Sequence, residues 1–130
     1  MASDVDAVRG ALVALDDAFA RKDLDGVLDL CTEDVVFIGS GDGEEAVGRE
    51  AIGPMFAALA PHLEGLEFSL VWDSVDVDIR GDVAILVAWG RAKLVTWRRD
   101  ETLRYRLTGV LLRSGGRWLS RTEETQYGCA

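Results

Sequence analysis

The sequence predicts an α+β fold in which three N-terminal helices pack against a strongly curved, mostly antiparallel sheet. Two observations support this prediction. Apolar residues recur at spacings of three and four through most of the first half of the chain, whereas the second half alternates apolar and polar residues between short turn sequences. Residues 82–97 are apolar at odd and even positions alike, so both faces of a strand there should be shielded from water. We interpret 82–97 as the centre of the sheet.

Size and composition limit the class of protein. The 130 residues are enough for one domain, 1–130, and a formal net charge of -9 disfavours binding to nucleic acid or to an anionic membrane. No apolar run approaches the roughly 20 residues that cross a bilayer. The two cysteines give no disulfide framework, and the sequence opens with acidic residues rather than a basic, apolar leader. We therefore expect a cytoplasmic protein.

Two helices and a strand are expected before the first glycine-rich loop. Ser3 can cap a helix whose apolar stripe runs to Phe19, and Asp23 can cap a short second helix that reaches Cys31. Residues 35–38 are apolar and mostly β-branched, which predicts the first strand. Four acids are assigned to the solvated faces of these helices: Asp16, Asp17, Asp25 and Asp29.

A third helix is predicted from the apolar spacing between Ile52 and Leu63. Pro61 is expected to end it. Pro54 requires either that the helix begin later than Arg49 or that it be kinked, because a proline cannot donate a backbone hydrogen bond.

The remaining chain predicts a series of hairpins, with one irregular strand. From 66 to 80 the apolar residues alternate, but their phase changes after Trp72, so we predict a bulge between Trp72 and Val75 that bends the strand. Turns are expected at 81–82, 98–101 and 114–116, with further strands at 103–113 and 118–127.

Several segments resemble the SnoaL-like branch of the nuclear transport factor 2-like (NTF2-like) superfamily. They are Lys22-Asp23-Leu24-Asp25-Gly26, Glu33-Asp34-Val35-Val36-Phe37, Gly48-Arg49-Glu50-Ala51-Ile52, Arg106-Leu107-Thr108 and Gly116-Arg117-Trp118. The resemblance covers nearly the whole chain. It implies the cone-shaped fold of that superfamily and a small-molecule pocket, in relatives that include polyketide cyclases, isomerases, dehydratases and catalytically inert binding or assembly domains.

The departures from that family exclude some chemistries. Ketosteroid isomerases carry an aspartate base just after the first strand, where this chain has Gly39 and Ser40. Many relatives end the last strand with histidines, where this chain reads Thr122-Glu123-Glu124-Thr125-Gln126. His62 is the single histidine and neither cysteine is near it in sequence, so we predict no metal site and no cofactor.

Glu123 and Glu124 are the candidate catalytic acids, because one of them must face inward from the last strand. A carboxyl group facing an apolar cavity has a raised pKa and can exchange protons near neutral pH. We favour Glu124 as the proton-transfer group, with Arg106 fixing its ionisation or stabilising an enolate. A three-residue loop at 114–116 would place Arg106 opposite Glu124, whereas a two-glycine turn would place Arg106 opposite Thr125 and Thr108 opposite Glu123. A simple structural pairing of the inward acid with an arginine is the alternative.

Large aromatic residues are expected to line the pocket, together with a few polar groups. The predicted ligand-binding residues are Phe19, Phe37, Phe56, Trp72, Trp89, Tyr105, Thr108 and Gln126. The resulting hypothesis is cofactor-independent cyclisation, isomerisation or hydration of a hydrophobic, polyketide-like small molecule. The alternatives are a non-catalytic ligand-binding protein and an assembly domain. We further expect a homodimer through the sheet face away from the helices, since three short helices can shield only one face.

Overall fold

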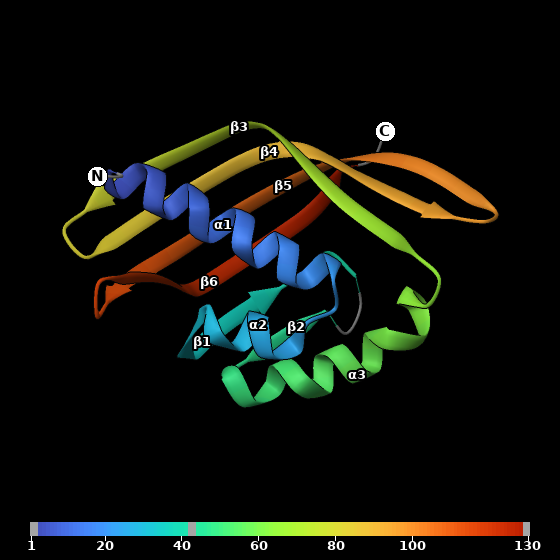
Figure 1. Ribbon diagram of the computed structural model, residues 1–130, viewed down its shortest axis with the longest axis horizontal. Coiled ribbons are helices and arrows are strands. Elements are labelled where there is room, and N and C mark those ends of the chain that lie inside the picture. Colours follow the sequence, from blue (N-terminus) through green and yellow to red (C-terminus); the bar gives the residue numbers. More distant parts are fainter. Residues whose placement is uncertain (1–2, 42–43, 129–130) are drawn as a thin grey trace.

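The computed structural model describes residues 3–41 and 44–128, with the backbone alone for 62, 63 and 128. Its elements are α1 (Asp4–Ala20), α2 (Leu24–Asp29), β1 (Cys31–Ile38), β2 (Glu45–Val47), the 3-10 helix η1 (Arg49–Ala51), α3 (Ile52–Leu63), β3 (Glu67–Arg80), β4 (Val83–Thr96), β5 (Arg99–Ser114) and β6 (Arg117–Gly128) (Figure 1). Six strands form one sheet in the order β2-β1-β6-β5-β4-β3. Of the strand pairs that the described residues form, only β1–β6 is parallel. The predicted α+β class is confirmed.

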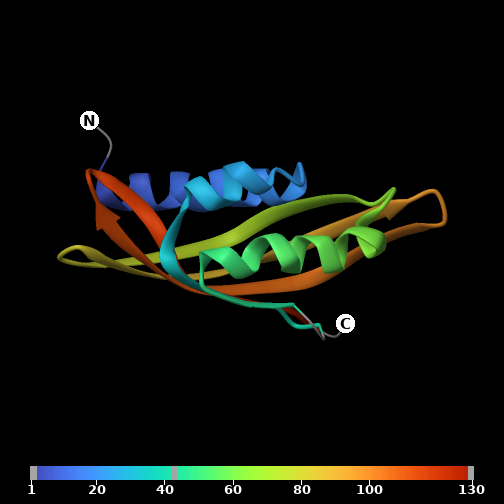
Figure 2. The same ribbon diagram turned by 90° about the horizontal axis from the view of Figure 1, so that it is seen from below.

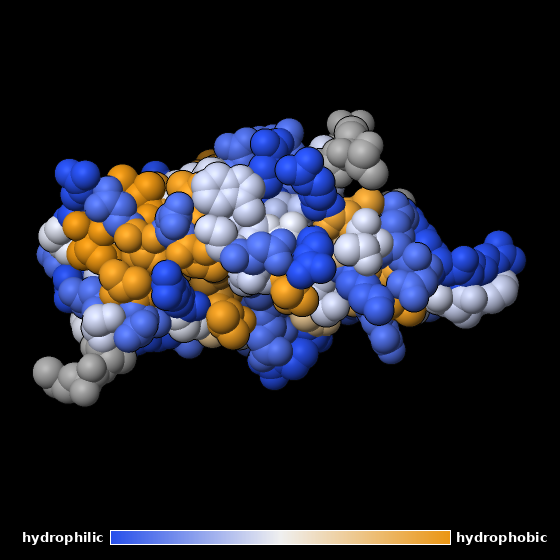
Figure 3. Space-filling model, turned by 90° about the horizontal axis from the view of Figure 1, so that it is seen from above, coloured by the Kyte–Doolittle hydropathy of each residue, from blue (hydrophilic) through white to orange (hydrophobic). Residues whose placement is uncertain are grey.

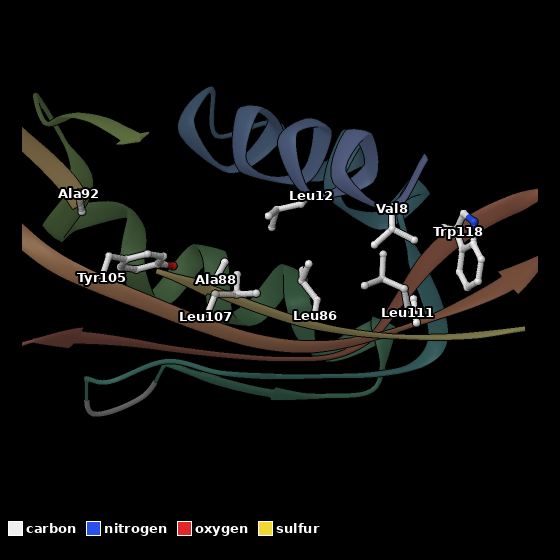
Figure 4. Packing of buried hydrophobic residues seen from close by; sticks show 10 residues of the cluster. Val8, Leu12, Leu86, Ala88, Ala92, Tyr105, Leu107, Leu111 and Trp118 are labelled. Carbon is white, nitrogen blue, oxygen red and sulfur yellow. The ribbon is translucent and has the colours of Figure 1, made fainter. Parts of the chain in front are cut away.

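The sheet is curved, and α1 lies along its inner face (Figure 2). Val8 and Leu12 of α1 pack onto Leu86, Leu107 and Leu111 of the sheet (Figure 4). The even positions of β4 point to the inner side of the sheet and include three fully buried alanines: Ala84, Ala88 and Ala92. The odd positions point to the outer face, where Ile85 and Trp89 are each 43% exposed. The expectation that 82–97 is the centre of the sheet is wrong, because β4 lies next to the edge strand β3 and the middle strands are β6 and β5.

A second core cluster joins α2, α3, β1 and β2 to the end of α1. It contains Leu15, Ala18, Val27, Cys31, Val35, Phe37, Ala46, Ile52 and Met55. The two clusters divide the inner side of the fold, with α1 contributing to both. No helix in the described part of the chain is long and apolar enough to span a membrane.

The helices differ from the prediction at their ends. Asp23 caps α2 as expected, its side chain accepting from the Gly26 N–H, but α2 ends at Asp29 and Cys31 begins β1. Helix α3 begins at Ile52 after the 3-10 turn, so Pro54 lies in the first turn, where its missing N–H breaks no helical hydrogen bond. The expectation that Pro61 ends α3 is wrong, because the helix continues to Leu63. A proline fits helical φ and costs α3 one hydrogen bond close to its end.

The predicted bulge in β3 is confirmed. Trp72 pairs with Gly90 and Ser74 pairs with Trp89, so Asp73 is the extra residue. The inner side chains are therefore Phe68, Leu70 and Trp72 before the bulge and Val75, Val77 and Ile79 after it. Gly90 is needed here, since a Cβ atom at this position would lie 2.3 Å from the Val71 carbonyl oxygen.

A second bulge sets the register of the last hairpin. Ser114 pairs with Arg117 across a two-glycine turn, and Leu111 pairs with Ser120. Val110 then pairs with Thr122, which leaves Arg121 as the extra residue. Arg106 consequently lies opposite Gln126, and Thr108 lies opposite Glu124. Neither register expected from the turn alone is correct, because the bulge shifts the pairing by one residue and reverses which side chains face inward.

Candidate active site

A cavity of about 180 Å³ lies on the inner side of the sheet. Its walls come from α1, β1, α3, β3, β5 and β6, and they are mainly apolar. The lining residues are Asp16, Phe19, Ala20, Lys22, Phe37, Ile38, Gly39, Glu44, Met55, Leu59, Leu66, Phe68, Leu70, Tyr105, Glu123, Thr125 and Tyr127. This composition, with few polar groups among aromatic and aliphatic side chains, is typical of a small-molecule site.

Glu123 is the most enclosed polar group of the cavity, with 5% of its surface exposed. Its cross-strand neighbours are Gly109 of β5 and Phe37 of β1, neither of which can pair with the carboxyl group. Among the described residues it makes no hydrogen bond or ion pair. Burial, and secondarily the charge of Asp16, raise the pKa of Glu123 to about 8. Near neutral pH it is therefore a carboxylic acid that faces an apolar space.

Asp16 supplies a second carboxyl group from α1. The indole Nε1–H of Trp72 donates to its Oδ2 at 2.7 Å. Burial raises the pKa of Asp16 to about 7, and the hydrogen bond from Trp72 partly opposes that rise. The expectation of a solvated Asp16 is wrong, because this residue lies at the edge of the stripe formed by Leu12, Leu15 and Phe19 and so faces the sheet.

Tyr105 completes the polar part of the wall. Its hydroxyl is hydrogen-bonded to the side chain of Thr125, and burial raises its pKa well above the ordinary value. The ring packs against Trp72 and Tyr127, with centroid distances of 5.5 and 5.1 Å. Both the ring and the hydroxyl of Tyr105 are thus held in place by neighbouring side chains.

The aromatic residues predicted to bind a ligand divide into three groups. Phe19, Phe37 and Tyr105 line the cavity. Phe56 packs behind Phe19 at 5.4 Å, and Trp72 lies behind Asp16 and Tyr105. Trp89 is on the opposite face of the sheet and 43% exposed.

The predicted catalytic pair is on the outer face. Glu124 and Arg106 are exposed there, and Arg106 donates a hydrogen bond to Gln126 Oε1. With Trp89 and Thr108 they border a second hollow of about 310 Å³. The expectation that Glu124 faces the pocket is therefore corrected: Glu123 faces it, because adjacent strand residues point to opposite sides and the bulge at Arg121 sets the phase.

The remaining chemistry-bearing residues form no metal centre in the described part of the chain, where no group of three or more histidine, cysteine or acidic side chains is suitably placed. Cys31 is a buried free thiol, and burial followed by the charge of Glu123 raises its pKa to about 12. Cys129 and the side chain of His62 lie outside the described residues.

Solved structures with the same architecture support a fold assignment. The chain is similar to a candidate dehydratase of the NTF2-like family from Streptomyces avermitilis, with 18% identity, 98% of this chain and 97% of that chain covered, and a TM-score of 0.80. It is similar to a ketosteroid isomerase-like protein from Erwinia carotovora atroseptica, with 19% identity, full coverage of both chains and a TM-score of 0.79. A candidate scytalone dehydratase from Novosphingobium aromaticivorans gives 14% identity, 97% and 85% coverage, and a TM-score of 0.80.

At these identities the likeness shows the fold alone, which is NTF2-like. No curated protein matches the chain. The family model of the SnoaL-like domain matches residues 8–120. The chain therefore belongs to the SnoaL-like domain family, as its sequence motifs predict.

Proposed function

We propose that this protein is a cofactor-independent proton-transfer enzyme acting on a hydrophobic small molecule. The observation that supports this most directly is the presence of two interacting carboxyl groups, Asp16 and Glu123, in one apolar cavity. Their pKa values of about 7 and about 8 leave Glu123 protonated and Asp16 partly ionised near neutral pH. One group is thus ready to donate a proton while the other accepts one.

These roles fit a carbonyl substrate. The Asp16 carboxylate removes a proton from the carbon next to the carbonyl, and the electron pair of that C–H bond forms the enol double bond. The Glu123 carboxylic acid protonates, or hydrogen-bonds to, the carbonyl oxygen as its charge develops. Return of the proton from Asp16 to another carbon completes an isomerisation. Addition of water to an enone, with Asp16 as the base, completes a hydration by the same two groups.

An exchange experiment tests this chemistry without knowledge of the natural substrate. Small ketones are incubated with the protein in D₂O, and loss of the α-proton signal is followed by NMR. We expect faster exchange with the wild-type protein and a large loss of that effect in Asp16→Asn. If Asp16→Asn alters ligand affinity but no ketone exchanges faster with wild type than in buffer, a non-catalytic binding protein is the better description.

We also propose that the protein is a homodimer formed through the outer face. This face has an uncovered apolar patch made of Val71, Val83, Ile85, Val87, Trp89, Val110 and Leu112. Ile85 and Trp89 are each 43% exposed. Figure 3 views the molecule from its β3 edge, where apolar surface lies toward one end among polar side chains, and it shows the outer face only edge-on. A second copy covering this patch would bury on the order of 1,600 Å², the usual size of a specific interface.

Sedimentation equilibrium at micromolar concentration tests the dimer. The wild-type chain should give twice 14.2 kDa. Ile85→Glu should shift it to the monomer, because it places a charge within the patch. Val13→Glu, at an exposed position of α1, is the matched control and should leave the mass unchanged. A wild-type monomer would contradict the proposal, and a larger ring would favour the assembly role.

A further inference from the structure

One extra residue in β6 decides which of its two adjacent glutamates enters the cavity. If β6 paired regularly with β5 from the two-glycine turn onward, Glu124 would lie opposite Leu107, which is buried on the inner side (Figure 4). The bulge at Arg121 moves every later residue by one place, so that Thr125 lies opposite Leu107 and Glu123 faces inward. We call these two arrangements the regular phase and the bulged phase.

The hydrophobic pattern of β6 favours the bulged phase only weakly. The regular phase would replace an inward glutamate and threonine by an inward glutamate and glutamine, a change that costs little apolar burial. Tyr127 is the exception, because its ring packs against Tyr105 with a centroid distance of 5.1 Å and the regular phase would turn it outward. A strand with polar residues on both faces is prone to slip in register. Contacts made by the bulge itself therefore add directly to the preference for Glu123.

Such a contact comes from β1. The guanidinium Nε of Arg121 lies 3.0 Å from Asp34 Oδ2, and Thr32 donates its hydroxyl to Asp34 Oδ1 at 2.8 Å. The hydrogen bond from Thr32, and to a smaller extent the charge of Arg121, hold the pKa of Asp34 below its ordinary value. The Asp34 carboxylate is thus ionised near neutral pH and held beside Arg121.

The irregular parts of β1 and β6 lie side by side. The pairs that flank them are Cys31 with Ser120 and Val36 with Thr122. Between these pairs β1 advances by five residues and β6 by two, and Asp34 belongs to the longer β1 segment. Arg121 is the residue of β6 that has no partner on β5. The ion pair therefore joins the two strands at the point where the phase of β6 is set.

We propose that Arg121 and Asp34 are positioning residues for Glu123, because their ion pair holds the bulge that turns Glu123 rather than Glu124 toward the cavity. Neither residue lines the cavity, so both act only through the phase of β6. The Arg121 and Asp34 side chains are 33% and 68% exposed, so the pair changes the ratio of the two phases by about two- to five-fold. The inference rests on the proposed function for the importance of Glu123, and it adds how the fold selects this glutamate.

Thiol labelling measures the phase of β6 without a substrate. Thr125→Cys, in a Cys129→Ser background, places a thiol on the cavity side in the bulged phase and on the outer face in the regular phase. A maleimide carrying a polyethylene glycol chain is too large to enter the cavity, so the labelling rate follows the fraction of the regular phase. We expect Arg121→Ala to raise this rate by about two- to five-fold. Cys31, a buried thiol in β1, should remain unlabelled and reports general unfolding.

Matched variants separate the ion pair at the bulge from ion pairs elsewhere on β6. Arg117→Ala removes a contact of 3.1 Å to Asp29 at the start of the strand and should leave the labelling of Thr125→Cys unchanged. Arg121→Lys keeps a cation beside Asp34 and should stay close to the parent rate. Reversing the pair, with Arg121→Asp and Asp34→Arg together, should also restore protection.

Deletion of Arg121 tests the phase most sharply. The deletion removes the ion pair together with the extra residue, and regular pairing then brings Glu123 and Thr125 to the inner side, so Thr125→Cys should stay protected. An unchanged rate in Arg121→Ala would overturn the proposal, because packing of Tyr127 would then set the phase alone. Faster labelling in the deletion variant than in Arg121→Ala would overturn it as well. Labelling as expected, in a protein that exchanges no ketone α-protons, would contradict the proposed enzyme and leave the positioning role standing.

Discussion

The two faces of β6 place two adjacent, chemically identical side chains in opposite environments. Glu123 points inward, is nearly fully buried, and has its pKa raised to about 8 by burial and by Asp16. Glu124 points outward and is exposed beside the Arg106–Gln126 hydrogen bond. The comparison shows that position on the sheet, rather than residue type, places one of two adjacent glutamates in an apolar cavity, where burial raises its pKa.

Replacing Glu123, the glutamate on the inner face, should have the largest effect on α-proton exchange activity. Glu123→Gln keeps the size of the side chain but removes its transferable proton, so we expect α-proton exchange to fall by about 100-fold or more. The matched variant Glu124→Gln should retain activity within about two-fold, since the Glu124 side chain lies on the outer face of the sheet. Equal losses in the two variants would show that the inner carboxyl has no special role.

The two acids on the inner face, Glu123 and Asp16, should also make the stability of the protein depend on pH. In the folded protein Glu123 and Asp16 hold their protons up to pH values of about 8 and about 7, whereas in the unfolded chain they release them near 4.5 and 3.8. Between these limits the folded state binds more protons, so the free energy of unfolding falls as the pH rises. The stability contributed by these groups is fully present below pH 4 and is lost by about pH 8.

Glu123→Gln should therefore flatten this dependence. Relative to wild type, the variant should gain a few kcal/mol of stability at pH 8 compared with pH 4, on the scale of about 1.4 kcal/mol for each unit of pKa shift. Urea unfolding at a series of pH values measures this difference. Glu124→Gln should follow the wild-type curve. A wild-type protein that becomes more stable between pH 5 and pH 8 through Glu123 would contradict its raised pKa.

Parts of this fold could be predicted from the sequence because they leave a clear pattern. The phase change after Trp72 is visible in large apolar residues, so the β3 bulge was predictable. The bulge at Arg121 was not, because the residues that follow it are threonine, glutamate and glutamine, which are found on either face of a strand. The preference for Glu124 over Glu123 also depends on placing Arg106 inside the pocket, whereas Arg106 pairs with Trp89 on the outer face.

Asp16 is a different case, because a signal was present. It is four residues after Leu12 and three before Phe19, which places it on the apolar stripe of α1. A carboxylate at such a position indicates a buried partner, but the partner, Trp72, is 56 residues away on β3. Helical spacing could thus have identified the acid, whereas its hydrogen bond depends on tertiary structure.

The strand geometry behind the inner face can be tested through Gly90. Gly90→Ala places a Cβ atom 2.3 Å from the Val71 carbonyl oxygen and 2.9 Å from Trp72 Cε3. Because the closest atom is backbone, the strands must separate, and we expect a loss of about 2 kcal/mol in the free energy of unfolding. Gly10→Ala is the control, since nothing lies within 4 Å of its added Cβ and it replaces a glycine in α1. That variant should gain up to about 1 kcal/mol. Equal effects would show that β3 and β4 are not tightly apposed at the bulge.

The smallest predicted effect concerns the Trp72 indole and its influence on the pKa of Asp16. Trp72 donates to the Asp16 carboxylate at 2.7 Å and so favours its charged form, which partly opposes the rise that burial causes in the pKa of Asp16. Trp72→Phe retains an aromatic ring against Tyr105 but removes the donor, and it should raise the pKa of Asp16 by about one unit. Titration of the Asp16 carboxyl carbon by ¹³C NMR measures this shift without any substrate, and the low-pH limb of the exchange activity should move by the same amount.

Trp89→Phe makes the same change on the outer face and should leave the Asp16 titration where it is. If Trp72→Phe folds normally and Asp16 still titrates near 7, the hydrogen bond does not set the ionisation of Asp16, and the assignment of base and acid between the two carboxyl groups would have to come from burial alone.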